Sequence, residues 1–245
     1  AISVSVNVFG QTTYVWDGSS VNPTSGANSN ISSIAFASTQ GNNNGTTTLI
    51  TSSSVSTGYT GATGGANFGA AAFKETLNTN SSTYFSVTVT PASGYKVNLG
   101  SLSLGSRGTS TGPGIITVYS NIDNYATPIG SATVSNNSTW ALVNITFSGS
   151  NLVGTASSPV TLRIYGSDSA GAANPSAGTA NWRIDDISLT VTPSAGTLAV
   201  TDLSAVKGGN FVKNTFVKND EITFGADAKD IKVYNMLGQI VKTAS

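Results

Sequence analysis

The sequence contains no histidine and no cysteine among its 245 residues. Without histidine it lacks the commonest general base, the commonest transition-metal ligand and every catalytic triad that uses an imidazole. Without cysteine it has neither a disulfide framework nor a thiolate nucleophile. These absences argue against most hydrolase chemistry, and we predict that the chain is not an enzyme.

Charged residues are also scarce: Lys, Arg, Asp and Glu make up 9% of the chain and balance to a net charge of zero. A neutral chain shows no electrostatic attraction to nucleic acid or to an anionic membrane surface. No segment approaches the ~20 apolar residues that span a bilayer as a helix. The abundance of Ser, Thr, Asn and Gly is instead typical of an extracellular or cell-surface protein.

The few charges lie unevenly along the chain. Residues 1–195 hold five Lys/Arg and six Asp/Glu, whereas residues 196–245 hold six Lys and five Asp/Glu. A composition shift of this size indicates a domain boundary, and the Pro, Ser and Gly of Thr192–Thr197 mark the linker. We therefore predict a large domain over residues 1–195 and a small module over residues 196–245.

The hydrophobic pattern indicates an all-β protein. Many short strands separated by turn signals predict a β-sandwich, and no stretch shows a convincing helical period. Six segments alternate with period two and are rich in β-branched or aromatic residues. They are Tyr84–Pro91, Ser101–Ser106, Ile115–Ser120, Trp140–Ser148, Val160–Gly166 and Trp182–Pro193.

Three other segments complete the description of the large domain. Ser38–Thr48 and Ser52–Ala66 are Gly-, Ser-, Thr- and Asn-rich, and we predict that they form surface loops. Ala1–Gly10 alternates cleanly, so it is either the first strand or the remnant of a secretory signal peptide.

Two stretches of the large domain resemble a jelly-roll-type β-sandwich of secreted bacterial multidomain proteins. In Tyr84–Tyr125, a strand ends in Pro-x-x-Gly-Tyr and a later turn carries Thr-Gly-Pro. In Val160–Thr192, the final strand carries Trp-Arg-Ile-Asp-Asp. The resemblance implies the fold and export from the cell, but such domains accompany many activities.

The segment Asn210–Ser245 resembles the first half of a type IX secretion sorting domain, a small β-sandwich. This family continues with further strands, so the module is partial over this chain, and the usual Tyr-Pro-Asn-Pro entry motif is absent. An incomplete sandwich leaves an exposed sheet edge. The resemblance depends on Asn210-Phe211, on Glu221–Phe224 and on a predicted hairpin whose matching residues are Lys232, Val233, Tyr234, Asn235, Gly238 and Gln239.

The sorting resemblance implies a route and a set of partners. Such domains deliver a folded cargo to an outer-membrane translocon and its cargo-binding components, so the protein would be secreted or held at the cell surface. Bacteria with this export system attach O-glycans at short Asp-Ser/Thr-apolar motifs, and Asp168-Ser169-Ala170 resembles one. Ser169 is therefore a candidate O-glycosylation site.

The acidic pair Asp185-Asp186 is the candidate metal site. Sugar-binding jelly rolls place a structural Ca²⁺ near an acidic residue of the last strand, and the pair resembles that position. Ca²⁺ takes 6–8 oxygen ligands. The alternative is hydrogen bonding to an arginine. In the calcium hypothesis, further ligands would come from Asp17, Asp123 and Asp168. In the alternative, the arginine that bonds to the pair is Arg163 or Arg183.

The two aspartates should differ in burial. Neighbours in a strand point to opposite faces, so unbroken alternation places Asp185 on the face of Ile187, Leu189 and Val191. We therefore predict that Asp185 is buried and structural and that Asp186 is exposed, unless a β-bulge shifts the register.

Trp16 is the candidate glycan-binding residue, because its strand ends beside polar loop residues. Together these features predict a non-enzymatic, exported surface protein that is adhesive or glycan-binding. One alternative is a structural subunit of a surface fibre, joined to copies of itself by β-strand addition. Another is an accessory domain of a secreted hydrolase.

Overall fold

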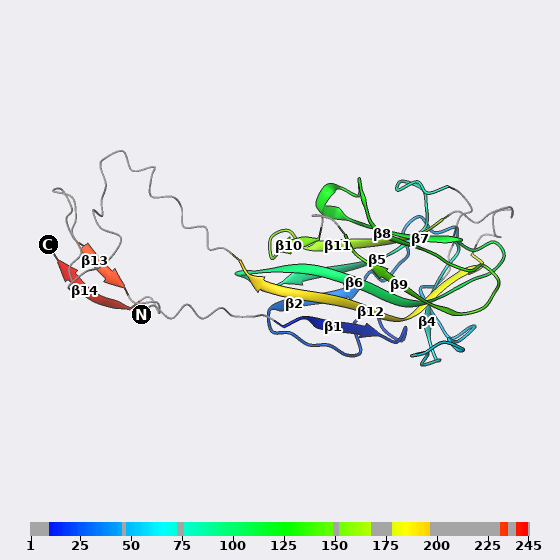
Figure 1. Cartoon of the computed structure of the whole chain (residues 1–245), viewed down its shortest axis with the longest axis horizontal. Helices are drawn as coiled ribbons and strands as arrows, with labels where there is room; N and C mark the ends of the chain where they lie inside the picture. Colours follow the sequence, from blue (N-terminus) through cyan, green and yellow to red (C-terminus); the bar gives the residue numbers. More distant parts are fainter. Residues whose placement is uncertain are drawn as a thin grey trace. The chain divides into compact units, whose positions relative to one another are not determined.

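The strands belong to two units of the chain. Ala1–Thr197 holds two β-sheets and Leu198–Ser245 holds a two-stranded sheet (Figure 1). In the described part of the chain the one helical element is a 3₁₀ turn, Asn121–Asp123. The predicted all-β sandwich with a small C-terminal β element is therefore confirmed. The structure is a computed structural model and describes residues 10–45, 48–72, 76–148, 152–167, 178–196, 231–234 and 239–244.

None of the described residues belongs to a helix with the length and apolarity needed to cross a membrane.

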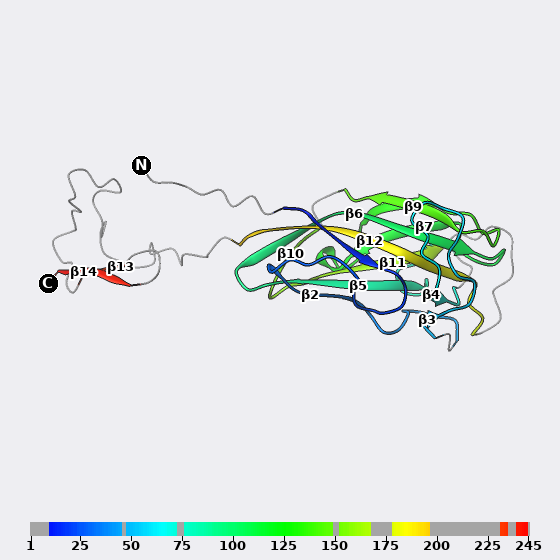
Figure 2. The ribbon, with the colours of Figure 1, turned by 90° about the horizontal axis from the view of Figure 1, so that it is seen from below.

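The seven-stranded sheet is built on its two longest strands, β6 (Tyr95–Gly108) and β12 (Trp182–Ala195), which pair antiparallel along most of their length (Figure 2). Both run beyond the segments that alternation predicted. Shorter strands flank this pair: β9 (Ala141–Thr146) and β10 (Val153–Thr155) on β6, β1 (Thr12–Trp16) and β4 (Asn67–Ala70) on β12, and β3 (Ile50–Thr51) on β4.

The second sheet has five antiparallel strands, and their bounds agree closely with the predicted segments where one was predicted. Its strands alternate in burial: Phe85, Val87 and Val89 are buried, whereas Tyr84 and Ser86 are partly exposed. One face of this sheet therefore packs in the core and the other faces outward. In order across the sheet the strands are β2 (Ile31–Phe36), β5 (Tyr84–Pro91), β11 (Val160–Ser167), β7 (Ile115–Ser120) and β8 (Pro128–Thr133).

Aromatic pairs join the two sheets in the core. Trp182 of β12 is fully buried, and its ring centre lies 4.7 Å from that of Phe85 on β5. Trp16 of β1 meets Phe36 of β2 edge to face at 5.2 Å. Because large aromatic side chains carry most of the buried apolar area, these contacts fix how the sheets stack.

The C-terminal sheet is the hairpin expected from its alternation. Its strands are β13 (Ile231–Tyr234) and β14 (Ile240–Ala244), with a register shift between Val233 and Tyr234. Tyr234, Ile240 and Val241 are each more than half exposed. The first nine residues lie outside the described part of the chain, so the two interpretations of Ala1–Gly10 both stay open.

Candidate functional site

A β-bulge in β12 corrects the prediction for the acidic pair. β12 pairs Asp185 with Gly105 and then Ser188 with Ser103, so Asp186 and Ile187 together face one residue of β6. Asp186 has a φ of 47°, in the left-handed region. Ile187 therefore points into the core, whereas Asp185 lies on the outer face. Unbroken alternation predicted that Asp185 and Ile187 share a face. That prediction is wrong, because the bulge places them on opposite faces.

Asp185 is nevertheless buried, because loops cover the outer face at this point. It is 0% exposed, and the backbone at Gly18 (φ 73°) packs against its Oδ1 atom and the Ala66 carbonyl. Oδ1 accepts a hydrogen bond from the Asp186 N–H at 2.8 Å, and Oδ2 has no hydrogen-bond partner among the described residues. The predicted burial is thus confirmed, but loop cover causes it.

Burial has an electrostatic consequence for this carboxyl. Loss of solvation raises the pKa of Asp185 from 3.8 to about 7, and the nearby Ser56 hydroxyl and the Asp186 N–H only partly oppose this rise. The folded protein therefore keeps the Asp185 carboxyl protonated up to about neutral pH.

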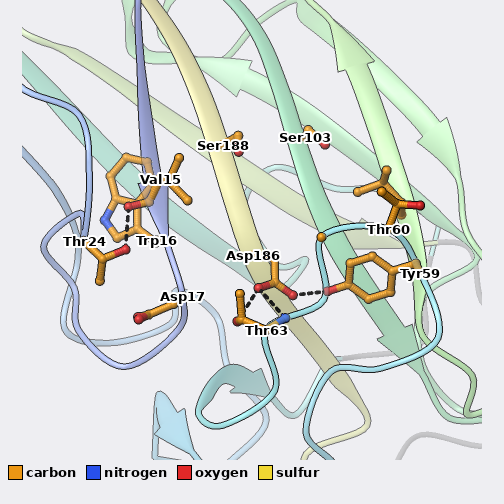
Figure 3. A pocket seen from close by; sticks show the side chains of 12 residues that line it. Val15, Trp16, Asp17, Thr24, Tyr59, Thr60, Thr63, Ser103, Asp186 and Ser188 are labelled. Atoms are coloured by element: carbon orange, nitrogen blue, oxygen red, sulfur yellow. Dashed lines mark hydrogen bonds between the residues drawn. The ribbon is translucent and has the colours of Figure 1, made fainter.

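The two aspartates do not converge on one metal site. The Asp186 carboxylate turns to the loop over residues 59–63, where it accepts hydrogen bonds from the Tyr59 hydroxyl and from the N–H and hydroxyl of Thr63 (Figure 3). The described residues contain no group of three acidic, His or Cys side chains that could hold a metal ion. A Ca²⁺ at this site would depend on Asp185 and on carbonyls such as that of Ala66.

The other acidic candidates are engaged elsewhere or lie outside the description. Asp17 accepts hydrogen bonds from the N–H and hydroxyl of Ser19, which lower its pKa. Asp123 accepts from the N–H groups of Ala126 and Thr127. Asp168 and Ser169 lie outside the described residues. Neither Arg163 nor Arg183 forms an ion pair with Asp185 or Asp186 in the described structure, and Arg183 instead donates to Asn67 at 3.1 Å.

A pocket of about 370 Å³ opens beside Asp186 on the outer face of the seven-stranded sheet. Ser103 and Ser188, which pair across β6 and β12, form its floor (Figure 3). Leu142 of β9, 41% exposed, adds an apolar side, and Tyr59 adds an aromatic one. We call this site the Tyr59 pocket.

Tyr59 is held firmly in this pocket. Its ring packs at 6.4 Å from Trp140, whose indole N–H donates to the Ser54 carbonyl at 3.0 Å and so fastens the same loop. Burial and the Asp186 carboxylate raise the pKa of the Tyr59 hydroxyl, which therefore stays a hydrogen-bond donor. A Cβ at position 105 would overlap that hydroxyl, so the approach of the loop requires Gly105.

The other predicted site residues lie apart from the Tyr59 pocket or only at its base. Trp16 is 0% exposed; its indole N–H donates to the Val21 carbonyl at 2.9 Å, and its ring packs on Phe36. A sugar therefore has no exposed indole face to stack on. Of the predicted sorting residues, Lys232, Val233, Tyr234 and Gln239 are described, whereas Asn235 and Gly238 are not.

Sequence reasoning preferred Trp16 to Tyr59 among the aromatic side chains, and it did not single out Leu142, Ser103 or Ser188. The only local signal was Gly105, a glycine inside an alternating strand, which indicates a close approach by another segment.

The sequence matches no protein-family model and no curated protein. The solved structures that are similar to this chain include the following three, with TM-scores near 0.3. A family 6 carbohydrate-binding module of a laminarinase from Zobellia galactanivorans is 17% identical, over 52% of this chain and 81% of its own, at a TM-score of 0.29.

The second structure is a family 11 carbohydrate-binding module from Clostridium thermocellum, bound to a β-1,3-1,4-mixed-linked tetrasaccharide. It is 12% identical over 73% of this chain and 95% of its own, at a TM-score of 0.31. The third is the K3 adhesin domain of Lys-gingipain from Porphyromonas gingivalis. It is 10% identical over 54% of this chain and 78% of its own, at a TM-score of 0.28. Similarity at this level assigns neither a ligand nor an activity to this chain.

Proposed function

We propose that this chain is a non-catalytic, saccharide-binding adhesive module of an exported surface protein, and that the Tyr59 pocket is its binding site. One observation carries the proposal: a fixed tyrosine ring and an apolar leucine stand over a floor of short hydroxyl side chains. A sugar presents apolar C–H faces and a rim of hydroxyls, which match an aromatic surface and a few fixed polar groups.

The carboxylates of the pocket favour binding over hydrolysis. A glycosidase needs one carboxylic acid that donates a proton and a second that acts as base or nucleophile. Asp17 and Asp186 line the pocket, but the pKa of Asp17 is lowered and three hydrogen-bond donors occupy Asp186. Asp185 has the raised pKa of an acid, but it is fully buried behind the pocket.

The route to the surface is the second part of the proposal. The resemblance of the tail to a type IX sorting domain supports export through an outer-membrane translocon. The hairpin β13–β14 forms at the predicted residues and exposes Tyr234, Ile240 and Val241. Exposed apolar side chains on a small sheet are suited to contact with a partner protein.

Filling the floor of the Tyr59 pocket should abolish saccharide binding. Ser103→Tyr places a large side chain on a partly exposed strand position, where aromatic residues are well accepted, so the fold should persist. We expect an affinity loss of about tenfold or more, or about 1.4 kcal/mol. Affinity electrophoresis against a panel of neutral polysaccharides measures it.

Thr146→Tyr is the matched control, because Thr146 is exposed on β9 of the same sheet and does not line the pocket. It should bind like the wild type. A wild type that binds no polysaccharide of the panel, or a Ser103→Tyr variant that binds normally, would contradict the proposal.

A further inference from the structure

The outer face of the five-stranded sheet carries an arginine stacked between two tyrosines. Arg163 stands on β11, with its Cζ atom 4.6 Å from the ring centre of Tyr84 on β5. The ring of Tyr125, which follows β7 and the 3₁₀ turn, lies 3.8 Å from the same atom. Both distances are within the range of cation–π contact.

Two further tyrosines fix the orientation of this guanidinium. Arg163 donates from Nη1 to the Tyr165 hydroxyl at 3.3 Å, and that hydroxyl donates to the Thr79 carbonyl at 3.0 Å. Tyr165 is fully buried and is packed by Tyr84 at 5.0 Å and by Tyr119 at 5.7 Å. A guanidinium held in this way presents its remaining N–H donors in a fixed plane.

The turn that supplies Tyr125 is built in an unfavourable backbone conformation. Asn124 and Tyr125 have φ values of 58° and 59°, and a bulky residue rarely adopts the left-handed region. The turn is held by the Tyr125 N–H, which donates to the Ser120 carbonyl at 3.0 Å, and by the Asp123 carboxylate, which accepts two N–H groups beyond it. Strain that the surroundings enforce is concentrated at functional sites.

Arg163 is the charged residue of the described strands of this sheet, and the Asp123 carboxylate of the adjoining turn accepts hydrogen bonds from the N–H groups of Ala126 and Thr127. No other residue of the five strands β2, β5, β11, β7 and β8 is charged. Among the described residues Arg163 forms no ion pair, and the hydroxyl to which it donates, that of Tyr165, is neutral. The face next to it carries hydroxyls: Ser86 pairs with Arg163 in register, and the Thr88 and Thr161 hydroxyls lie 2.9 Å apart.

We propose that this face is a second binding site, for an acidic polysaccharide whose carboxylate or sulfate group is held by Arg163. A planar guanidinium pairs with such oxyanions through two parallel hydrogen bonds, and pre-orientation lowers the entropic cost of doing so. The tyrosine rings and the neighbouring hydroxyls suit the sugar around the anionic group. A single cation does not suit a nucleic acid or an anionic bilayer, because both are bound through several cations.

Matched polymers test this site. Dextran, carboxymethyl dextran and dextran sulfate share one backbone, so titration calorimetry with each separates the contribution of the anionic group. We expect binding of at least one anionic polymer and no comparable binding of dextran itself; the polymer that binds identifies carboxylate or sulfate as the group. Equal binding of all three polymers, or binding of none, would refute the proposal.

Variants then assign the binding to Arg163. Arg163→Gln should weaken the affinity for the anionic polymer about tenfold or more. Arg163→Lys should keep only part of the wild-type affinity, because an ammonium group lacks the planar fork of a guanidinium. Arg107→Gln is the control: Arg107 is a partly exposed arginine of the other sheet, which donates to the Ser138 carbonyl. If Arg107→Gln weakens binding as much as Arg163→Gln does, the attraction is diffuse and the proposal is wrong.

Two more variants keep the result interpretable. Tyr125→Ala changes only the turn and leaves Arg163 in its strand, so it should also weaken binding even if Arg163→Gln does not fold. Unchanged binding by a folded Tyr125→Ala would contradict the stacked site. Ser103→Tyr should bind the anionic polymer normally, because the Tyr59 pocket is on the other sheet; this separates the failure of one site from the failure of the other.

Discussion

The wild-type protein should lose unfolding free energy as the pH rises from about 4 to about 7, whereas Asp185→Asn should not lose it for this reason. In the absence of divalent cations the difference between the two proteins should change by roughly 4 kcal/mol over this window. The folded-state pKa of Asp185 is raised from 3.8 to about 7 by burial. Below the lower value the carboxyl is protonated in both states and carries no penalty. As the pH rises through this window, only the unfolded state ionises freely, so the folded state is disfavoured.

Urea unfolding of both proteins across this window measures the difference. It should grow as the pH rises to about 7 and stay constant above it, because the carboxyl is then ionised in both states. Asp17→Asn is the control of opposite sign: the pKa of Asp17 is lowered, so its stabilising effect is present at neutral pH and is lost in acid. A difference between wild type and Asp185→Asn that does not vary with pH would show that Asp185 is not buried as a lone carboxyl.

Calcium should offset the loss of unfolding free energy that the ionised Asp185 carboxylate causes at alkaline pH. An ionised Asp185 with an unpartnered, buried Oδ2 atom and a carbonyl nearby supplies the hard oxygen ligands that Ca²⁺ prefers. At about pH 8, Ca²⁺ should therefore raise the melting temperature of the wild type, and a chelator should reverse the rise. Asp185→Asn should not respond. If the wild type does not respond either, Asp185 does not bind Ca²⁺.

The sequence predicted best the strands of the five-stranded sheet that lie between two neighbouring strands. β5 and β7 begin and end at the predicted residues, because a strand with one face in the core must alternate apolar and polar side chains. β8 and β4 were missed: "PIGSAT" and "NFGA" are short and rich in small residues, so they carry little periodic signal. Long-range pairing, which local patterns do not encode, defines such strands.

The candidate sites were harder to predict than the fold. One β-bulge in β12 changed the face of Asp185, and alternation cannot locate a bulge without the partner strand. The Tyr59 pocket joins a loop at residues 59–63 to strand residues that are forty or more positions away in the sequence, such as Ser103 and Ser188. Likewise, Tyr84, Tyr125 and Arg163 meet only because β5, β11 and β7 are neighbours in the sheet.

Deletion of residues 198–245 should abolish release from a bacterium that carries the type IX translocon, while the sandwich still folds. Residues 1–197 form a unit of their own, whose core is made by the two large sheets, so the truncated protein should keep the melting temperature of the full chain. The tail holds the sorting resemblance and the exposed hairpin β13–β14, so under the proposed export route its removal should prevent recognition by the translocon.

Cell fractionation with immunodetection measures the outcome: the truncated protein should accumulate in the periplasm, and the full chain should reach the surface or the medium. Full-length Ser103→Tyr is the control, because it alters the sandwich and leaves the tail intact, and it should be exported normally. A truncated protein that unfolds would be degraded rather than retained, and the melting temperature of purified 1–197 distinguishes the two. Normal export of a folded 1–197 would show that the hairpin is a stabilising β element with no part in sorting.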